Sequence, residues 1–195
     1  ITSDINDVIS SQGVYLHNFG AILKTSPADQ CVTLPDSVFN VGGINTRRVE
    51  PRNTPSVINA VFNYRNFWDG RANNAFNGVN PFGSRDTGAT IWKLVNKQYQ
   101  QVPVALDFSS LASQAVGPPG SAFEMSCDGR GFADIGRKLI SGKQLIPLGT
   151  QHVSLTDSVL GGLAIKNKTG LSTTYMNMIQ KAFRPEFTQT TMVGS

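Results

Sequence analysis

Glycine and proline occur so often in this chain that few long regular elements can form. The 195 residues include 19 Gly and 10 Pro, and both residue types interrupt helices and strands. Between residues 26 and 55 they break every regular pattern, at Pro27, Pro35, Gly42, Gly43, Pro51 and Pro55. Hydrophobic residues make up 39% and charged residues 15%, which is below common globular usage but not low enough to predict disorder. We therefore expect long ordered loops between short elements.

Where apolar residues recur, they do so near helical spacing. Residues 4–23 carry such a pattern, although Gly13 weakens its middle. Further helices, some only a turn or two long, are expected over residues 56–61, 90–99, 108–115, 132–140 and 172–183, the last capped by Ser172 or Thr173. Residues 73–88 are rich in Asn and Gly and predict a surface loop. Because no strand-like alternation persists, the predicted fold is mainly α with long loops.

The charge and hydropathy patterns argue against two classes of partner. The formal net charge is +4, but the arginines are scattered and form no run of five, so nucleic-acid binding is not expected. No apolar stretch approaches the roughly 20 residues that span a bilayer, so no membrane span is expected. Neither a signal peptide nor a Met precedes Ile1, which favours a processed, cleaved or excised segment.

The two cysteines, Cys31 and Cys127, lie far apart, and neither belongs to a CxxC pair. This spacing excludes a zinc ribbon and a local redox motif. A disulfide between them and a free buried thiol are both compatible with the sequence.

Two blocks of sequence carry the functional information. The first contains Arg52-Asn53-Thr54-Pro55, Phe62-Asn63 and Phe67-Trp68-Asp69-Gly70-Arg71-Ala72. The second contains Gln114-Ala115-Val116-Gly117-Pro118 and then Glu124-Met125. In order and internal spacing they resemble the RN-x-P … FN … FWDGRA and QA-x-GP … EM signatures of the bacterial di-haem cytochrome c peroxidase and MauG family. Trp68 and Glu124 lie 56 positions apart, farther than in the simpler peroxidases, so residues 73–110 are interpreted as an insertion, which loops tolerate at low entropic cost.

The resemblance implies a cytochrome c-like helical domain segment. Family members hold two c-type haems, each through a CxxCH motif, and this sequence contains neither motif. We therefore expect residues 1–195 to form the central segment of a di-haem peroxidase-like protein, with haem c attached through cysteines outside the chain. A degenerate relative that has lost its haems is the alternative. The expected partners are the haem-bearing remainder, on the same or another chain, and a small electron-donor protein. The expected location is periplasmic or secreted.

The resemblance assigns roles to three side chains beside the haems. Trp68 would relay electrons between them, because an indole lowers the tunnelling barrier relative to a gap; the alternative is a core tryptophan. Glu124 would move the proton during peroxide cleavage; the alternative is a helix cap or an ion pair with Arg130. Met125, next to Glu124, is expected to contact the haem.

Four further assignments follow from the resemblance, each with a structural alternative. Asn53 is either an oxygen ligand for calcium or an Asx-turn residue before Pro55. Arg52 and Arg71 would bind haem propionates or pair with Asp69. His17 is either a ligand of the upstream haem iron or a structural residue.

The predicted function is therefore part of a di-haem c-type peroxidase that reduces hydrogen peroxide, or uses it for oxidation, with electrons relayed between two haems. A non-catalytic electron-transfer or scaffold module is the first alternative. The second is oxidation of a larger substrate, a protein or polyisoprene, as in MauG-type and rubber-oxygenase relatives.

Overall fold

A computed structural model describes residues 10–141 and 147–188 of the chain. The chain divides into two compact units. Unit 1 comprises residues 1–18 and 32–130, and unit 2 comprises residues 19–31 and 131–195. In the described residues, no helix combines the length and apolar character needed to cross a membrane.

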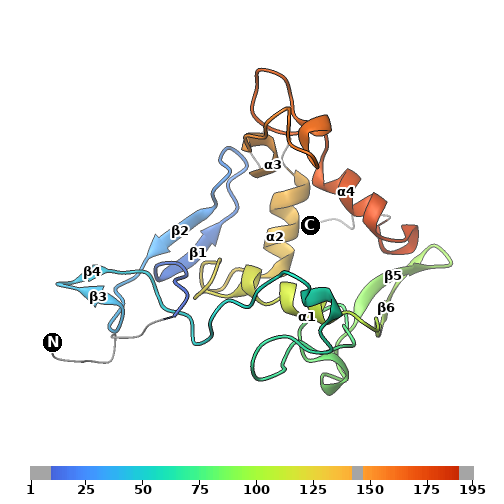
Figure 1. Ribbon diagram of the computed structural model, residues 1–195, viewed down its shortest axis with the longest axis horizontal. Helices are drawn as coiled ribbons and strands as arrows, with labels where there is room; N and C mark the ends of the chain where they lie inside the picture. The colour runs from blue at the N-terminus through green and yellow to red at the C-terminus, as the bar shows by residue number, and fades with distance from the viewer. Residues whose placement is uncertain (1–9, 142–146, 189–195) are drawn as a thin grey trace. The chain divides into compact units, whose positions relative to one another are not determined.

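The mainly α prediction is wrong. Helical residues make up only 24% of the structure and strand residues 19%. In the described residues the strands form three two-stranded sheets, β1–β2, β3–β4 and β5–β6, of which the last two are antiparallel. Their bounds are β1 His17–Ala21, β2 Gln30–Thr33, β3 Asn40–Val41, β4 Ile44–Asn45, β5 Ile91–Val95 and β6 Gln98–Val102. Long loops connect them (Figure 1), as glycine and proline predict.

The described part of residues 4–23 does not form the expected helix. Residues 1–9 lie outside the described residues, and residues 17–21 form β1, which pairs with β2. Upstream of β1 the backbone bonds to distant partners, because Gly13 N donates to Arg48 O at 2.9 Å and Val14 N donates to Phe123 O at 3.0 Å. These long-range hydrogen bonds use the groups that a local helix would need.

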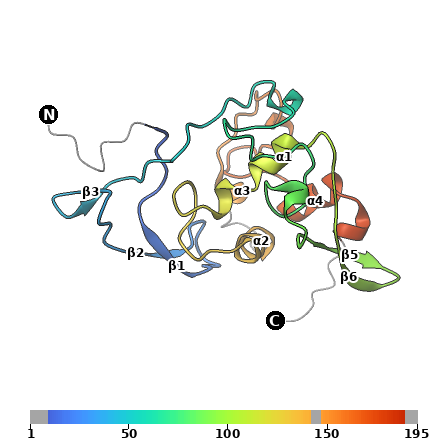
Figure 2. The ribbon, with the colours of Figure 1, turned by 90° about the horizontal axis from the view of Figure 1, so that it is seen from below.

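Residues 90–99 form a β-hairpin instead of the expected helix. In β5 and β6, Ile91 lies opposite Val102 and Val95 lies opposite Gln98, and the two strands run side by side in both views (Figures 1 and 2). The turn residues Asn96 and Lys97 have positive φ angles of 49° and 65°, as a type I′ turn requires. The sequence signal for this hairpin was the asparagine at the two-residue turn. The spacing of the apolar residues, taken alone, predicted a helix instead.

The helix expected over residues 56–61 is also absent. A single 3₁₀ turn, η1 (Ala60–Phe62), replaces it. Asn59 has a left-handed φ of 59°, which interrupts right-handed helix geometry just where the helix was expected to continue.

Three expected helices are confirmed. They are α1 (Ser110–Ala115), α2 (Phe132–Ser141) and α4 (Tyr175–Ala182). The cap of α4 is Thr174 rather than Ser172 or Thr173, since its Oγ1 accepts from Asn177 N at 3.1 Å. The remaining short elements are α3 (Pro147–Thr150), η2 (Gly83–Arg85), η3 (Pro118–Gly120), η4 (Gly161–Leu163) and η5 (Pro185–Phe187).

The interior of unit 1 is polar. Its buried side chains include Ser110, Ser113, Asn73 and Asn77. Ser113 Oγ donates to Asn73 O at 2.8 Å, and Asn77 Nδ2 donates to Gly83 O at 3.0 Å. Residues 73–88 are therefore an organised loop with buried asparagines rather than a simple surface loop, because amide side chains replace the hydrogen bonds of regular structure.

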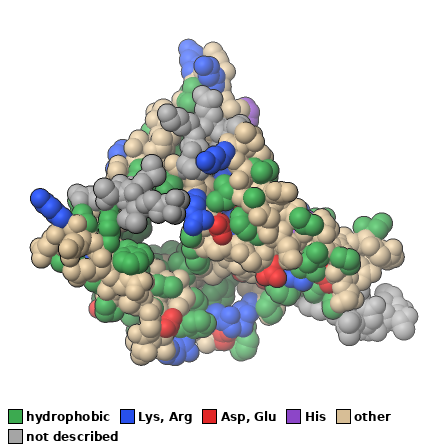
Figure 3. Space-filling view, turned by 180° about the vertical axis from the view of Figure 1, so that it is seen from behind, with side chains coloured by type: hydrophobic (Ala, Val, Ile, Leu, Met, Phe, Trp, Pro, Cys, Tyr) green, Lys and Arg blue, Asp and Glu red, His purple; other side chains and the backbone are tan. Residues whose placement is uncertain are grey.

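Large apolar side chains of unit 1 face outward. Eight of those described have exposed fractions between 70% and 84%, namely Val41, Ile44, Val57, Ile58, Phe62, Tyr64, Trp68 and Phe108. Figure 3 shows apolar side chains at many places on the surface. Such concentrated exposure is typical of surfaces that another group or chain covers.

Unit 2 has a small apolar core and one buried ion pair. Leu148 and Leu171 are buried, with Val153, Leu160 and Tyr175 packed against them. On α2, Lys138 Nζ lies 3.0 Å from Asp29 Oδ1, and both side chains are 5% exposed. Lys138 Nζ also donates to Leu23 O at 2.5 Å and to Ser26 O. The pair therefore ties α2 to the 23–29 segment of the same unit.

Both cysteines are disulfide-bonded in the structure, and neither is free. Of the two possibilities that the sequence left open, the disulfide is the one observed.

Substituting Lys138 should destabilise unit 2. In Lys138→Met, Asp29 and two backbone carbonyls lose a buried cationic donor, so the free energy of unfolding should fall by about 3–5 kcal/mol. Arg137→Ala is the matched control, because Arg137 pairs with Asp134 at 3.0 Å but is 66% exposed, and such pairs contribute at most about 1 kcal/mol. Urea unfolding of the two variants checks this; equal losses would contradict the structural role of the buried pair.

Candidate functional site

The Phe67–Ala72 segment forms a tight loop that presents Trp68. Asn66 N donates to Ala72 O at 3.2 Å, and Gly70 N donates to Phe67 O at 3.0 Å. Phe67 and Gly70 both have a positive φ of 64°, a conformation that glycine adopts without strain. Trp68 lies at the tip of this loop and is 83% exposed. It is therefore not a core tryptophan of unit 1.

Asp69 joins the two halves of the first sequence block. Its Oδ2 accepts from Arg52 Nε at 3.1 Å and from Arg71 Nε at 2.9 Å, and its Oδ1 accepts from Arg71 N at 3.2 Å. Partial desolvation opposes ionisation, but these hydrogen bonds and the Arg71 charge outweigh it and lower the pKa of Asp69. Of the two expected roles for Arg52 and Arg71, pairing with Asp69 is present in the structure.

Ser121 shapes the turn that carries Glu124. The Phe123 and Glu124 N–H groups each donate to Ser121 Oγ at 3.3 Å, and Met125 N donates to Ser121 O at 3.1 Å. The Arg48 guanidinium lies 4.4 Å from the centroid of the Phe123 ring, a cation–π contact that holds this ring in place. Glu124 is half-buried, and its position is set by backbone hydrogen bonds rather than by a helix.

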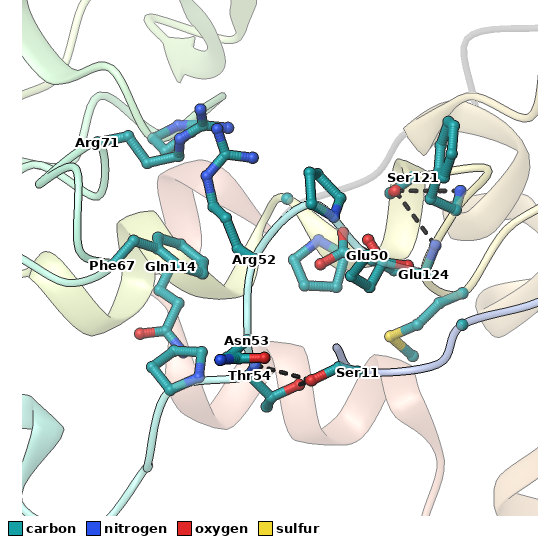
Figure 4. Close-up of a pocket in the computed structure, with 18 of the residues that line it drawn as sticks. Ser11, Glu50, Arg52, Asn53, Thr54, Phe67, Arg71, Gln114, Ser121 and Glu124 are labelled. Carbon is teal, nitrogen blue, oxygen red and sulfur yellow. Dashed lines mark hydrogen bonds between the residues drawn. The ribbon is translucent and has the colours of Figure 1, made fainter. Parts of the chain in front are cut away.

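The two sequence blocks line one pocket of unit 1, with a volume of about 580 Å³ (Figure 4). The first block contributes Arg52, Asn53, Phe67 and Arg71, and the second contributes Gln114, Glu124 and Met125. Trp68 lines a neighbouring open pocket of about 620 Å³ together with Arg52 and Asn53. Residues of both blocks, far apart in the sequence, therefore line one pocket, and Trp68 lies beside the neighbouring one.

Glu50 is a residue of this site that sequence reasoning missed. It lines the same pocket and is only 8% exposed, and its Oε1 atom has no hydrogen-bond partner among the residues that the structure describes. Burial, and next the charge of Glu124, raise the pKa of Glu50 from 4.5 to about 7. The sequence signal that could have identified Glu50 as a site residue is its place in Val49-Glu50-Pro51, directly before Arg52 of the first block.

Gly13 allows Glu50 to be buried. Glu50 N donates to Ser11 O at 2.8 Å, so the 11–14 segment runs beside Glu50 on one side and beside Phe123 on the other. A Cβ atom on Gly13 would lie 2.5 Å from Glu50 Oε1 and would overlap the Phe123 carbonyl. The glycine that weakened the helix prediction is therefore required by this close approach.

The other predicted site residues lie in different surroundings. Met125 lines the pocket and is 64% exposed. Asn53 Oδ1 accepts from Ser10 Oγ at 2.9 Å. Among the described residues, no group of three or more His, Cys, Asp and Glu side chains could hold a metal ion. His17 is in β1, where its Nδ1 lies 2.8 Å from Tyr15 O, and it lines neither of these two pockets.

Comparison with known proteins agrees with the resemblance. The family model described as di-haem cytochrome c peroxidase matches residues 28–194. No curated protein and no solved structure matches the chain. The matched region contains both sequence blocks and most of the pocket residues, and it covers most of the chain. The chain therefore belongs to the di-haem cytochrome c peroxidase family.

Proposed function

We propose that this chain is part of a di-haem c-type peroxidase that reduces hydrogen peroxide, or uses it for oxidation, with electrons relayed between two haems. The observation that carries the proposal is the single pocket lined by both family blocks, with Glu124 and the Asp69–arginine cluster around it. This arrangement combines a proton-transfer group with cationic donors, as reduction of a small oxidant needs.

The residues of this site fit a haem. The apolar side chains of Met125 and Trp68 are exposed. Glu50 and Gln114 each have a buried side-chain oxygen with no partner in the described part of the chain. Arg52 and Arg71 each use Nε for Asp69, and each guanidinium has further donors that suit a propionate. When bound, the haem iron supplies the redox chemistry by which the O–O bond breaks. Both cysteines of this chain are disulfide-bonded, which supports attachment of haem c through cysteines outside it.

Glu124 is the proposed proton-transfer residue. Its carboxylate accepts a proton from one peroxide oxygen and delivers it to the other, which leaves as water. The turn around Ser121 aims it into the pocket, and Met125 beside it is proposed to contact the haem. An exposed indole at Trp68 is available for contact with a group outside unit 1, which supports the electron-relay role.

The remaining roles follow the resemblance. Asn53 is proposed to offer its side-chain oxygen to a calcium ion, and His17 to ligate the upstream haem iron. The disulfide favours an oxidising compartment and so supports a periplasmic or secreted location. The proposed partners are the haem-bearing remainder and a small electron-donor protein.

Replacing Glu124 tests the catalytic role. Glu124→Gln keeps the shape of the side chain but cannot take up a proton, so peroxide reduction by the haem-loaded protein should fall about 10²- to 10⁴-fold. The Soret absorbance should be unchanged. Asp128→Asn is the matched control, since Asp128 is exposed four positions away, and it should retain full activity. Unchanged turnover in Glu124→Gln would remove this residue from the mechanism, whereas reversible reduction without any turnover in the unmodified protein would favour the electron-carrier alternative.

Replacing Trp68 tests the relay. Trp68→Phe should slow electron transfer between the haems, because the smaller ring leaves a wider gap, and stopped-flow absorbance of the two haems measures this rate. Trp92→Phe is the control, since Trp92 is also exposed, at 61%, but lies on β5. Both substitutions should change the free energy of unfolding by no more than about 0.5 kcal/mol, as exposed sites do. Equal transfer rates in the two variants would refute the relay role.

A further inference from the structure

The pocket contains two glutamates, Glu50 and Glu124, whose charges interact. In Figure 4 the carboxyl groups of Glu50 and Glu124 are adjacent, and the charge of Glu124 acts on Glu50. Glu50 is only 8% exposed, and within residues 10–141 and 147–188 its Oε1 finds no hydrogen-bond partner. A buried ionised carboxylate without a partner is costly, and a second negative charge beside it adds to that cost.

The nearby cations are directed elsewhere. Arg52 Nε and Arg71 Nε donate to Asp69, at 3.1 Å and 2.9 Å. Arg48 Nε donates to Asp36 at 2.9 Å, and its guanidinium covers the Phe123 ring. These three arginines therefore form their ion pairs with Asp36 and Asp69. When Glu50 and Glu124 are both ionised, the two carboxylates carry negative charge that these ion pairs do not neutralise.

We propose that Glu50 and Glu124 form a carboxyl pair that shares one proton, and that Glu50 is a positioning residue which holds this proton beside Glu124. The pair itself does not depend on the proposed function; only its role in peroxide reduction rests on that function. In the singly protonated pair the net charge is −1. When Glu124 accepts a proton from peroxide, the pair holds two protons and becomes neutral; delivery of that proton to the leaving oxygen restores the starting state. Two like carboxyls at one site divide their protonation in this way.

The raised pKa of Glu50 supports the pair and determines its effect on stability. Because the folded pKa of about 7 exceeds the unfolded value near 4.5, the native state binds more protons between these values. The stabilisation linked to Glu50 is therefore fully present below about pH 4.5 and is lost as the pH rises through about 7. Removing the charge at Glu50 should abolish this loss.

Infrared titration of the purified protein tests the pair without any turnover. A protonated carboxyl C=O band should be present at pH 6 and should disappear as the pH rises through about 7. Glu50→Gln should lack this band, and Asp128→Asn should retain it. In thermal unfolding, Glu50→Gln should lose less stability than the unmodified protein between pH 5 and pH 8. Absence of the band from the unmodified protein, or its persistence in Glu50→Gln, would overturn the proposal.

If Glu50→Gln does not fold, the variant Glu124→Gln tests the same proposal. In Glu124→Gln the band of Glu50 should remain, because burial persists, but its titration should move to lower pH, because the neighbouring charge is gone. An unchanged titration would show that the two carboxyls do not interact and would refute the pair. If the band shifts as expected while Glu124→Gln retains peroxide turnover, the pair stands and the proposed catalytic role of Glu124 fails.

Discussion

The carboxylate of Asp69 is the interaction on which the first half of the site depends. It accepts from Arg52 Nε and Arg71 Nε and from the Arg71 backbone, so the segment before Pro55 and the loop that carries Trp68 are held to one another. Arginine suits this task because its planar guanidinium keeps further donors after one bond is made. The other contacts of the Trp68 loop are its own backbone hydrogen bonds and two arginine donors, from Arg65 to Gly70 O and from Arg85 to Arg71 O.

Unit 1 uses polar contacts where most domains use an apolar core. Serine and asparagine side chains fill its interior and bond to backbone carbonyls, while large apolar side chains point outward. Hydrogen bonds of this kind fix geometry but contribute little net stability each. The arrangement is consistent with an apolar surface that a cofactor covers, as membership of a di-haem family implies.

Sequence patterns located some elements and misplaced others for identifiable reasons. The helical stripes of α2 and α4 were sufficient, because both helices lie in unit 2 and contact each other, and Tyr175 of α4 packs against the Leu148–Leu171 core. The same type of stripe failed at residues 90–99, where Asn96 and Lys97 adopt left-handed conformations and reverse the chain. It failed again before β1, where backbone groups of Gly13 and Val14 bond to residues far along the chain. The spacing of apolar residues shows which side chains can share one face. It does not show which backbone groups will form hydrogen bonds with distant parts of the chain instead of within a local helix.

The sequence by itself determined the family and the order of the two motif blocks, and it predicted Glu124, Arg52 and Arg71 as candidate site residues, because these depend on residue types at set spacings. Only the tertiary structure showed that Glu50 belongs to the site. Its burial arises from Gly13, Ser11 and Phe123, three residues from two other parts of the chain. The protonation of a carboxyl group depends on its solvent exposure and on neighbouring charges, and both are properties of the folded arrangement that no local sequence pattern contains.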